Sequence, residues 1–180
     1  MRRNSPPPPL DSEALDRLAL RYVERFATTR AKLRDYLARK VRERGWAGET
    51  PPDPAAVAER MAEFRYVDDR AFAEARVRSL GRRGLGARRI DLALRAAGIE
   101  AEDAAFVRDD IDAQADASAL AFAKRRRLGP YASRPSDDPR ARDKAFAAML
   151  RAGHAPDRIR RLLALDAADL PHFDADGDPS

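Results

Sequence analysis

The chain has 180 residues, which is enough for one domain or for a string of small helical units. Its 35 lysines and arginines outnumber 30 aspartates and glutamates, so the net charge is +5, and 36% of all residues are charged. The absence of cysteine excludes disulfides, thiol catalysis and cysteine-bound zinc, and two histidines are too few for a histidine-rich metal site. No apolar run is long enough to cross a bilayer, so we expect a cytoplasmic protein with no membrane contact.

Helical signals follow one another along most of the chain. Before them, four consecutive prolines predict a disordered leader over residues 1–9, which we favour over a proline-motif ligand. Apolar residues at helical spacing, N-cap residues and terminal glycines then predict nine helices. Their expected positions are 11–26, 30–44, a third that opens at Pro54, two within 66–99, and then 101–113, 115–128, 139–152 and 156–165. No run alternates apolar and polar residues as a strand does, so we expect no β-sheet.

A degenerate internal repeat divides these helices into three groups of three. A helix ends at each of Gly45, Gly98 and Gly153, and a short link leads to the next helix. The predicted fold is therefore all-α, with three tandem three-helix repeats over residues 10–65, 66–114 and 115–165 in an elongated right-handed array. Residues 166–180 hold five aspartates and no lysine or arginine, which predicts an acidic disordered tail. Competition of this tail with nucleic acid for a basic face stays open.

The stretch 66–99 is the most informative part of the chain. Phe72, Ala75 and Leu80 recur at near-helical spacing, and a second apolar stripe follows after a glycine-rich turn. We expect an N-cap at Asp68, and we expect the glycines to leave N–H groups of the second helix free to meet an anion. The residues that set this motif are Asp68, Asp69, Phe72, Gly84, Gly86, Ile90, Leu94 and Gly98.

Two arginine-rich clusters have almost no acidic neighbours. The like charges within such a cluster repel one another, and a negatively charged partner would reduce this repulsion. The alternative is a charged helix face that is only solvated. We therefore predict contact with a polyanion or with an acidic protein surface. The candidate residues are Arg76, Arg78, Arg82, Arg83, Arg88, Arg89, Arg95, Lys124, Arg125, Arg126 and Arg127.

The sequence offers no arrangement typical of an enzyme. The glycines at 81–86 lie between two helices, whereas a nucleotide-binding loop lies between a strand and a helix. We interpret Asp68 and Asp69 as helix-start residues rather than metal ligands, and His154 as a turn or packing residue rather than a base. We therefore expect no catalytic residue, no metal and no cofactor.

The central motif resembles the signature of RecX regulatory proteins. The resemblance is carried by Tyr66-Val67-Asp68-Asp69-Arg70-Ala71-Phe72-Ala73, Arg82-Arg83-Gly84, Gly86, Arg88-Arg89-Ile90, Leu94-Arg95 and Gly98-Ile99. Weaker similarity covers residues 18–37 and 120–163. The resemblance implies three tandem three-helix repeats, a monomer in the cytoplasm and no catalysis. It also implies binding to RecA, the bacterial recombinase, and to its filament on single-stranded DNA, which limits filament growth and damps recombination, DNA repair and the SOS response.

Two other classes stay open on the residues alone. A helix-turn-helix with a basic second helix is typical of proteins that bind DNA directly, here independently of RecA. A helical scaffold with another acidic partner also fits the charge pattern. Direct contact with DNA is compatible with either a RecA regulator or an independent DNA-binding protein.

Overall fold

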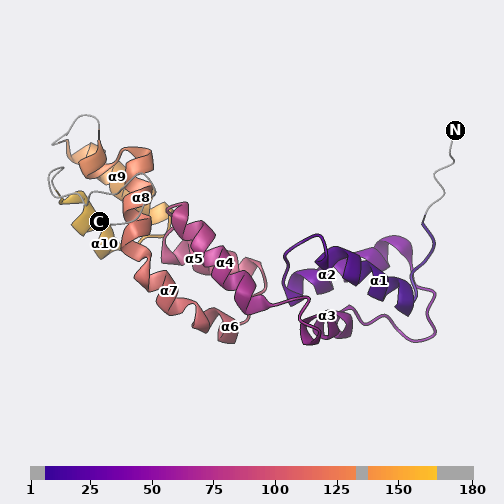
Figure 1. Cartoon of the computed structure of the whole chain (residues 1–180). Helices are drawn as coiled ribbons and strands as arrows, with labels where there is room; N and C mark the ends of the chain where they lie inside the picture. The colour runs from indigo at the N-terminus through magenta and orange to yellow at the C-terminus, as the bar shows by residue number, and fades with distance from the viewer. Residues whose placement is uncertain (1–6, 133–137, 166–180) are drawn as a thin grey trace. The chain divides into compact units, whose positions relative to one another are not determined.

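The computed structural model describes residues 7–132 and 138–165. Over this part of the chain the elements are helices, joined by turns, and the only β-type pairing is an isolated parallel bridge between Leu10 and Trp46 (Figure 1). The all-α class is therefore confirmed. The predicted acidic tail and most of the predicted leader lie outside the described residues. The helices are α1 Ser12–Val23, α2 Arg30–Arg44, α3 Pro54–Glu63, α4 Asp69–Arg82, α5 Ala87–Ala96, α6 Ala101–Phe106, α7 Arg108–Ala113, α8 Ala115–Arg126, the 3-10 turn η1 Gly129–Tyr131, α9 Pro139–Arg151 and α10 Pro156–Leu163.

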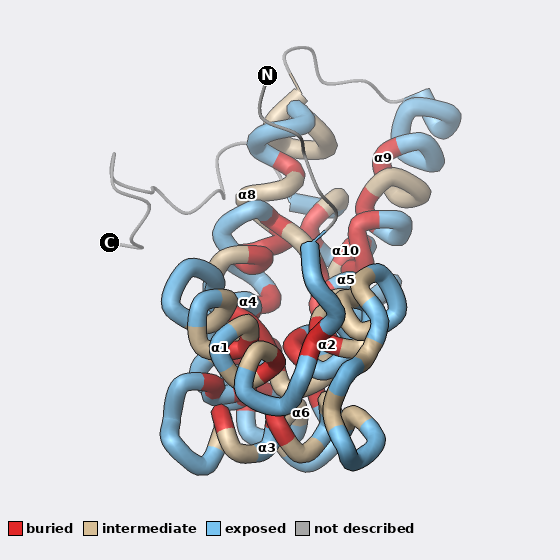
Figure 2. Tube along the Cα trace, turned by 90° about the vertical axis from the view of Figure 1, so that its right-hand side faces the viewer, coloured by how far each residue is buried: buried red, intermediate tan, exposed pale blue. Residues whose placement is uncertain are grey.

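Two predicted helices differ from the observed ones. The helix expected over 101–113 breaks at Val107 into α6 and α7; Val107 and Ile111 are buried, whereas α6 buries no residue of its own. The first helix ends at Val23, so Phe26 lies beyond it and is 52% exposed. In α4 the buried positions are Ala73, Val77 and Leu80, and Phe72 is only half-buried. Figure 2 shows buried and exposed stretches alternating along the helices. The expected inward position at Ala75 was wrong, since this residue is exposed.

The described chain divides into two compact units. Unit 1 contains residues up to Ala75 together with Leu94–Phe106, and unit 2 contains Arg76–Ala93 together with the residues from Val107 onward. We describe each unit by itself.

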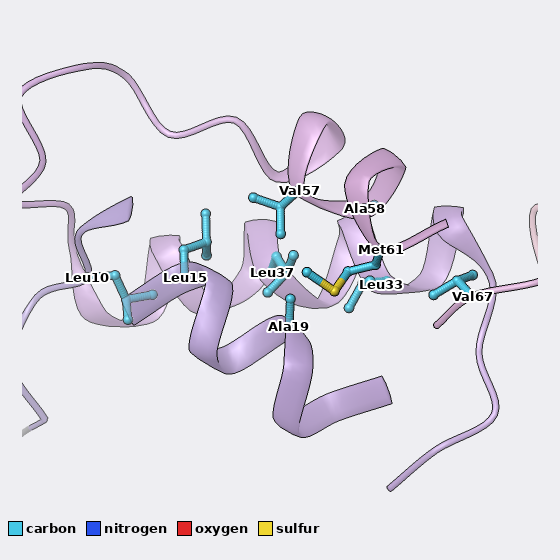
Figure 3. Close-up of a cluster of buried hydrophobic side chains, with 9 residues drawn as sticks. All are labelled: Leu10, Leu15, Ala19, Leu33, Leu37, Val57, Ala58, Met61 and Val67. Atoms are coloured by element: carbon cyan, nitrogen blue, oxygen red, sulfur yellow. The ribbon is translucent and has the colours of Figure 1, made fainter. Parts of the chain in front are cut away.

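Helices α1, α2 and α3 form the core of unit 1. Each presents apolar residues four positions apart on one face, such as Leu33 and Leu37 of α2 or Val57 and Met61 of α3. Figure 3 shows these side chains meeting between the three helices. Side chains of the N-cap residues accept hydrogen bonds from the first turns, Asp11 in α1, Thr29 in α2 and Asp53 in α3. The local capping signals thus fix where each helix starts.

One hydrophobic cluster of unit 2 lies between α8, α9 and α10. Its buried residues are Ala119, Ala123, Met149, Ile159 and Leu162. Alanine carries a small side chain, so the two alanines of α8 allow the larger residues of α9 and α10 to pack close to that helix.

Candidate partner and nucleic-acid interface

The two aspartates of the central motif have different roles. Asp68 accepts a hydrogen bond from the backbone N–H of Ala71 at 2.9 Å, which confirms it as the N-cap of α4. Asp69 is buried, and its carboxylate accepts from the backbone N–H of Arg30 at 2.9 Å and from the Arg30 Nε–H at 3.1 Å. Asp69 is therefore a structural residue, but it ties α4 to the start of α2, which its place in the first turn of α4 alone did not predict.

Arg30 is the centre of a network of charges in unit 1. Beyond Asp69, its guanidinium reaches Asp103 at 3.2 Å and Glu59 at 3.4 Å. Arg70 adds a second contact to Asp103 at 3.4 Å. The hydrogen bond that the Arg30 guanidinium donates to Asp69 is the main reason that the pKa of Arg30 is raised. This network joins α2, α3, α4 and α6, and its carboxylates are engaged with arginine; no group of residues in the described part of the chain is arranged to hold a metal ion.

The glycines of the central turn serve packing. A Cβ on Gly84, whose φ is +72°, would lie 2.7 Å from the backbone nitrogen of Phe122, and a Cβ on Gly86 would lie 2.4 Å from the carbonyl carbon of Gly153. The expectation that these glycines free N–H groups for an anion was wrong. The N–H of Gly86 donates to the carbonyl of Ala152 at 2.9 Å, and that of Arg88 donates to the carbonyl of Gly153 at 3.2 Å. The positive N-terminal end of α5 contacts the negative C-terminal end of α9, so N–H groups of one helix end hydrogen-bond the carbonyls of the other.

A similar junction occurs in unit 1. The hydroxyl of Thr29 donates to the carbonyl of Ala97 at 2.6 Å, so the start of α2 meets the end of α5. Gly98 has φ +72°, and a Cβ there would lie 2.2 Å from the Cβ of Ala31. In both units the beginning of one helix is docked on a glycine-terminated helix end, which is the contact that a tandem repeat of helices produces.

The structure brings the two predicted basic clusters together in unit 2. The guanidinium of Arg125 in α8 donates to the carbonyls of Arg83 at 2.6 Å and Arg82 at 3.2 Å, at the end of α4. The side chains of Arg82, Arg83 and Arg126 are exposed around this contact, and we call these four arginines the basic patch. Arg83, Arg125 and Arg126 line an open hollow of about 380 Å³ together with Leu85 and Phe122.

Two of the candidate arginines serve as helix-end residues. Arg125 satisfies carbonyls at the end of α4, and Arg89 donates its Nε–H to the carbonyl of Arg151, the last residue of α9, at 3.1 Å. A cation at the C-terminal end of a helix also complements the helix dipole. Both side chains therefore contribute to the closure of helix ends within unit 2.

The remaining candidates are exposed. Arg76, Arg78, Arg88, Lys124 and Arg127 lie on unit 2, and Arg95 lies on unit 1. Arg78 already has a partner within the protein. Arg127 ends α8 in a left-handed conformation, with φ +53°, a position that usually favours glycine.

His154 is a packing residue, as predicted. It is 2% exposed, its Nε2–H donates to the carbonyl of Gly84 at 3.1 Å, and its ring centre lies 5.7 Å from that of Phe122. Burial lowers the pKa of its imidazole, the hydrogen bond to Gly84 opposes that shift, and nearby Arg158 adds to it. The neutral ring holds α4 and α9 together in unit 2.

The fold and the site together define a helical-repeat protein with a cationic surface. Residues 68–107 match the family described as RecX, second three-helix domain. The regulatory protein RecX of Myxococcus xanthus is 30% identical over 146 residues, which cover 77% of this chain and 78% of that protein. The regulatory protein RecX of Agrobacterium fabrum is 32% identical over 152 residues, which cover 82% of this chain and 80% of that protein. The chain therefore belongs to the RecX family of regulatory proteins.

A solved structure supports the fold. The crystal structure of RecX from Lactobacillus salivarius aligns with a TM-score of 0.60 at 20% identity, over 84% of this chain and 93% of that one. Within the described residues, none of the helices has both the length and the apolar character needed to cross a membrane.

Proposed function

We propose that this chain regulates RecA by binding RecA and its filament on single-stranded DNA, and that its main effect is inhibition. Membership of a family of regulatory proteins supports a regulatory role, and the basic patch is the observation that carries the proposed contact. Arg125 of α8 contacts the carbonyls of Arg82 and Arg83 at the end of α4, and Arg126 lines the same hollow as Arg83 and Arg125. Guanidinium groups bind carboxylate and phosphate with paired hydrogen bonds, so the patch suits acidic protein surface and DNA backbone alike.

The proposed mechanism is a shift between filament states. A bound regulator changes an equilibrium only when it binds one state better than the other. We propose that the chain binds, as a monomer in the cytoplasm and without a cofactor or catalytic step, the filament state that adds or retains fewer protomers. The three repeats proposed over residues 10–65, 66–114 and 115–165 supply the contact surface, and the recurring helix junction supports this division.

The local geometry argues against an independent helix-turn-helix DNA reader. Such a protein inserts the N-terminal residues of its second helix into the major groove. Here the first N–H groups of α5 are engaged with carbonyls at the end of α9, and Arg89 contacts the same helix end. The backbone at that end of α5 is therefore docked on the end of α9.

Reversing the charge of the basic patch tests the proposal. The triple variant Arg82→Glu, Arg83→Glu and Arg126→Glu leaves Arg125 at its helix end and removes three exposed cations. We expect the concentration needed to inhibit the RecA ATPase on single-stranded DNA to rise about tenfold or more, the effect of about 1.4 kcal/mol of lost binding.

A matched variant controls for the change in net charge. Arg140→Glu, Arg142→Glu and Lys144→Glu alter three exposed residues of α9 in the same unit. We expect this variant to inhibit RecA like the parent chain. Equal inhibition by the parent chain and both variants would rule the patch out as the contact.

A further inference from the structure

A series of aromatic rings lies on unit 1. The rings of Tyr22 and Tyr36 are stacked, with centroids 4.2 Å apart and planes 25° apart. Phe26, beyond the end of α1, continues the series with its ring centroid 5.2 Å from that of Tyr22. The two tyrosines pack against the core of unit 1, whereas Phe26 is 52% exposed. The series thus has an anchored base and an exposed end.

Cations flank these rings. The guanidinium carbon of Arg25 lies 5.8 Å from the centroid of the Phe26 ring. The guanidinium carbon of Arg39 lies 5.6 Å from the centroid of the Tyr36 ring, and the Nζ of Lys40 lies 5.9 Å from it. Each of these distances is within the reach of a cation–π contact. Positive charge therefore accompanies the aromatic series at both of its ends.

One acid lies beside these cations. Glu43 contacts Lys40 at 2.6 Å and Arg39 at 3.6 Å, and the hydrogen bond from Lys40 is the main reason that the pKa of Glu43 is lowered. Exposed ion pairs of this kind contribute little free energy and are screened by salt. Arg39 has further N–H donors that Glu43 does not use, and no carboxylate contacts Arg25 among the described residues. A phosphate therefore finds donors at this surface.

We infer that Phe26, with Tyr22, Tyr36 and the cations Arg25, Arg39 and Lys40, forms a stacking site for single-stranded nucleic acid. Proteins that bind single strands combine aromatic rings, on which bases stack, with cations that hold the phosphates. An apolar protein partner would suit this surface less well, because the charged side chain of Arg25 lies beside the exposed ring and two more cations lie over Tyr36. The inference goes beyond the proposed function, since it requires no RecA.

The test measures binding to single strands without RecA. The probes are a fluorescein-labelled oligothymidylate and a strand of the same length in which abasic sites replace the bases. We expect Phe26→Ala to weaken binding of the oligothymidylate by about tenfold, the change that about 1.4 kcal/mol of lost stacking produces. Binding of the abasic strand should not change, because its phosphates still meet the cations. Phe26→Trp should restore binding of the oligothymidylate.

Phe64→Ala is the matched control, because Phe64 is 66% exposed on the same unit and no cation is placed over its ring in the described structure. It should bind both probes like the parent chain. The inference is overturned if Phe26→Ala binds oligothymidylate like the parent, or if it weakens both probes equally. It is also overturned if polyglutamate competes as well as oligothymidylate and is equally sensitive to Phe26→Ala, which would indicate an acidic protein partner. None of these results depends on RecA, so this test and that of the proposed function fail separately.

Discussion

Asp69 is a buried charge whose neighbours are arranged to neutralise it. Its two oxygens accept from the backbone and the side chain of Arg30, and Arg30 in turn reaches Asp103 and Glu59. A buried ion pair contributes little net stability compared with apolar residues of the same shape, but removal of one partner leaves an uncompensated group. Removal of one member of this network therefore lowers the free energy of unfolding by more than the intact network contributes to it.

Asp69→Asn tests this at a single residue. We expect the free energy of unfolding to fall by about 3 kcal/mol, because Arg30 loses its closest carboxylate in a mostly buried position. Urea unfolding followed by circular dichroism measures the change. Asp91→Asn, at an exposed position of α5, should change it by less than about 0.5 kcal/mol. A loss below about 1 kcal/mol for Asp69→Asn would show that Asp69 is not essential to the network.

His154 makes stability depend on pH. Its pKa is lowered in the folded chain, so below about pH 6.5 the unfolded chain binds a proton at this residue before the folded chain does. Stability is therefore complete above about pH 6.5 and is lost as the pH falls toward the lowered pKa. We expect His154→Gln, which keeps a donor for Gly84, to reduce the loss of stability between about pH 7 and pH 5.5. Identical pH profiles of the two chains in urea unfolding would contradict this role of His154.

The junctions between helix ends are the features that join one element to the next. At the junction of α5 and α9, backbone meets backbone so closely that no side chain fits at Gly86. We expect Gly86→Ala to lower the free energy of unfolding by about 2–3 kcal/mol, because the added methyl group must displace the carbonyl of Gly153. Differential scanning calorimetry measures the change.

The neighbouring variant Arg88→Ala separates packing from charge. Arg88 has an exposed side chain, and its backbone N–H bond to Gly153 survives the substitution. We expect its thermal unfolding to match that of the parent chain within about 0.5 kcal/mol. If Gly86→Ala unfolded at the same temperature as Arg88→Ala, the junction would tolerate the extra methyl group and the steric argument would fail.

Most of the helices could be predicted because their starting signals are local. Thr29 and Asp53 cap the helices that follow them within three residues, and Gly45 and Gly153 end helices with positive φ. The break at Val107 could not be predicted, because the helical pattern of 101–113 continues through it and only burial of Val107 and Ile111 distinguishes its two parts.

The candidate site was only partly predictable, because local sequence patterns do not show contacts between residues far apart along the chain. The two basic clusters are evident in the sequence, since each is a run of arginines without nearby acids. The contact between the two clusters is not evident in the sequence, because Arg125 binds carbonyls more than 40 residues away along the chain. Arg89 likewise binds a carbonyl 62 residues away. The ion pair of Arg30 with Asp69 spans 39 residues, and a local pattern assigns each of them only to its own helix end. The aromatic series of unit 1 was missed, although Tyr22 and Phe26 are one helical turn apart.

Considered as a whole, the chain carries a modest net charge of +5 on a highly charged surface. Net charge alone steers a protein toward any polyanion and does not select a partner. Selection has to come from the local arrangement, and the basic patch of unit 2 and the aromatic series of unit 1 are the two arrangements that the described residues offer. The first underlies the proposed regulation of RecA, and the second the inferred contact with single-stranded nucleic acid.

Co-sedimentation of the intact chain with RecA filaments assembled on single-stranded DNA tests the central claim most directly. We expect the chain to pellet with the filaments and the triple variant of the basic patch to pellet much less. A chain that stays in the supernatant, whether or not filaments are present, would contradict the proposal that it regulates RecA by binding.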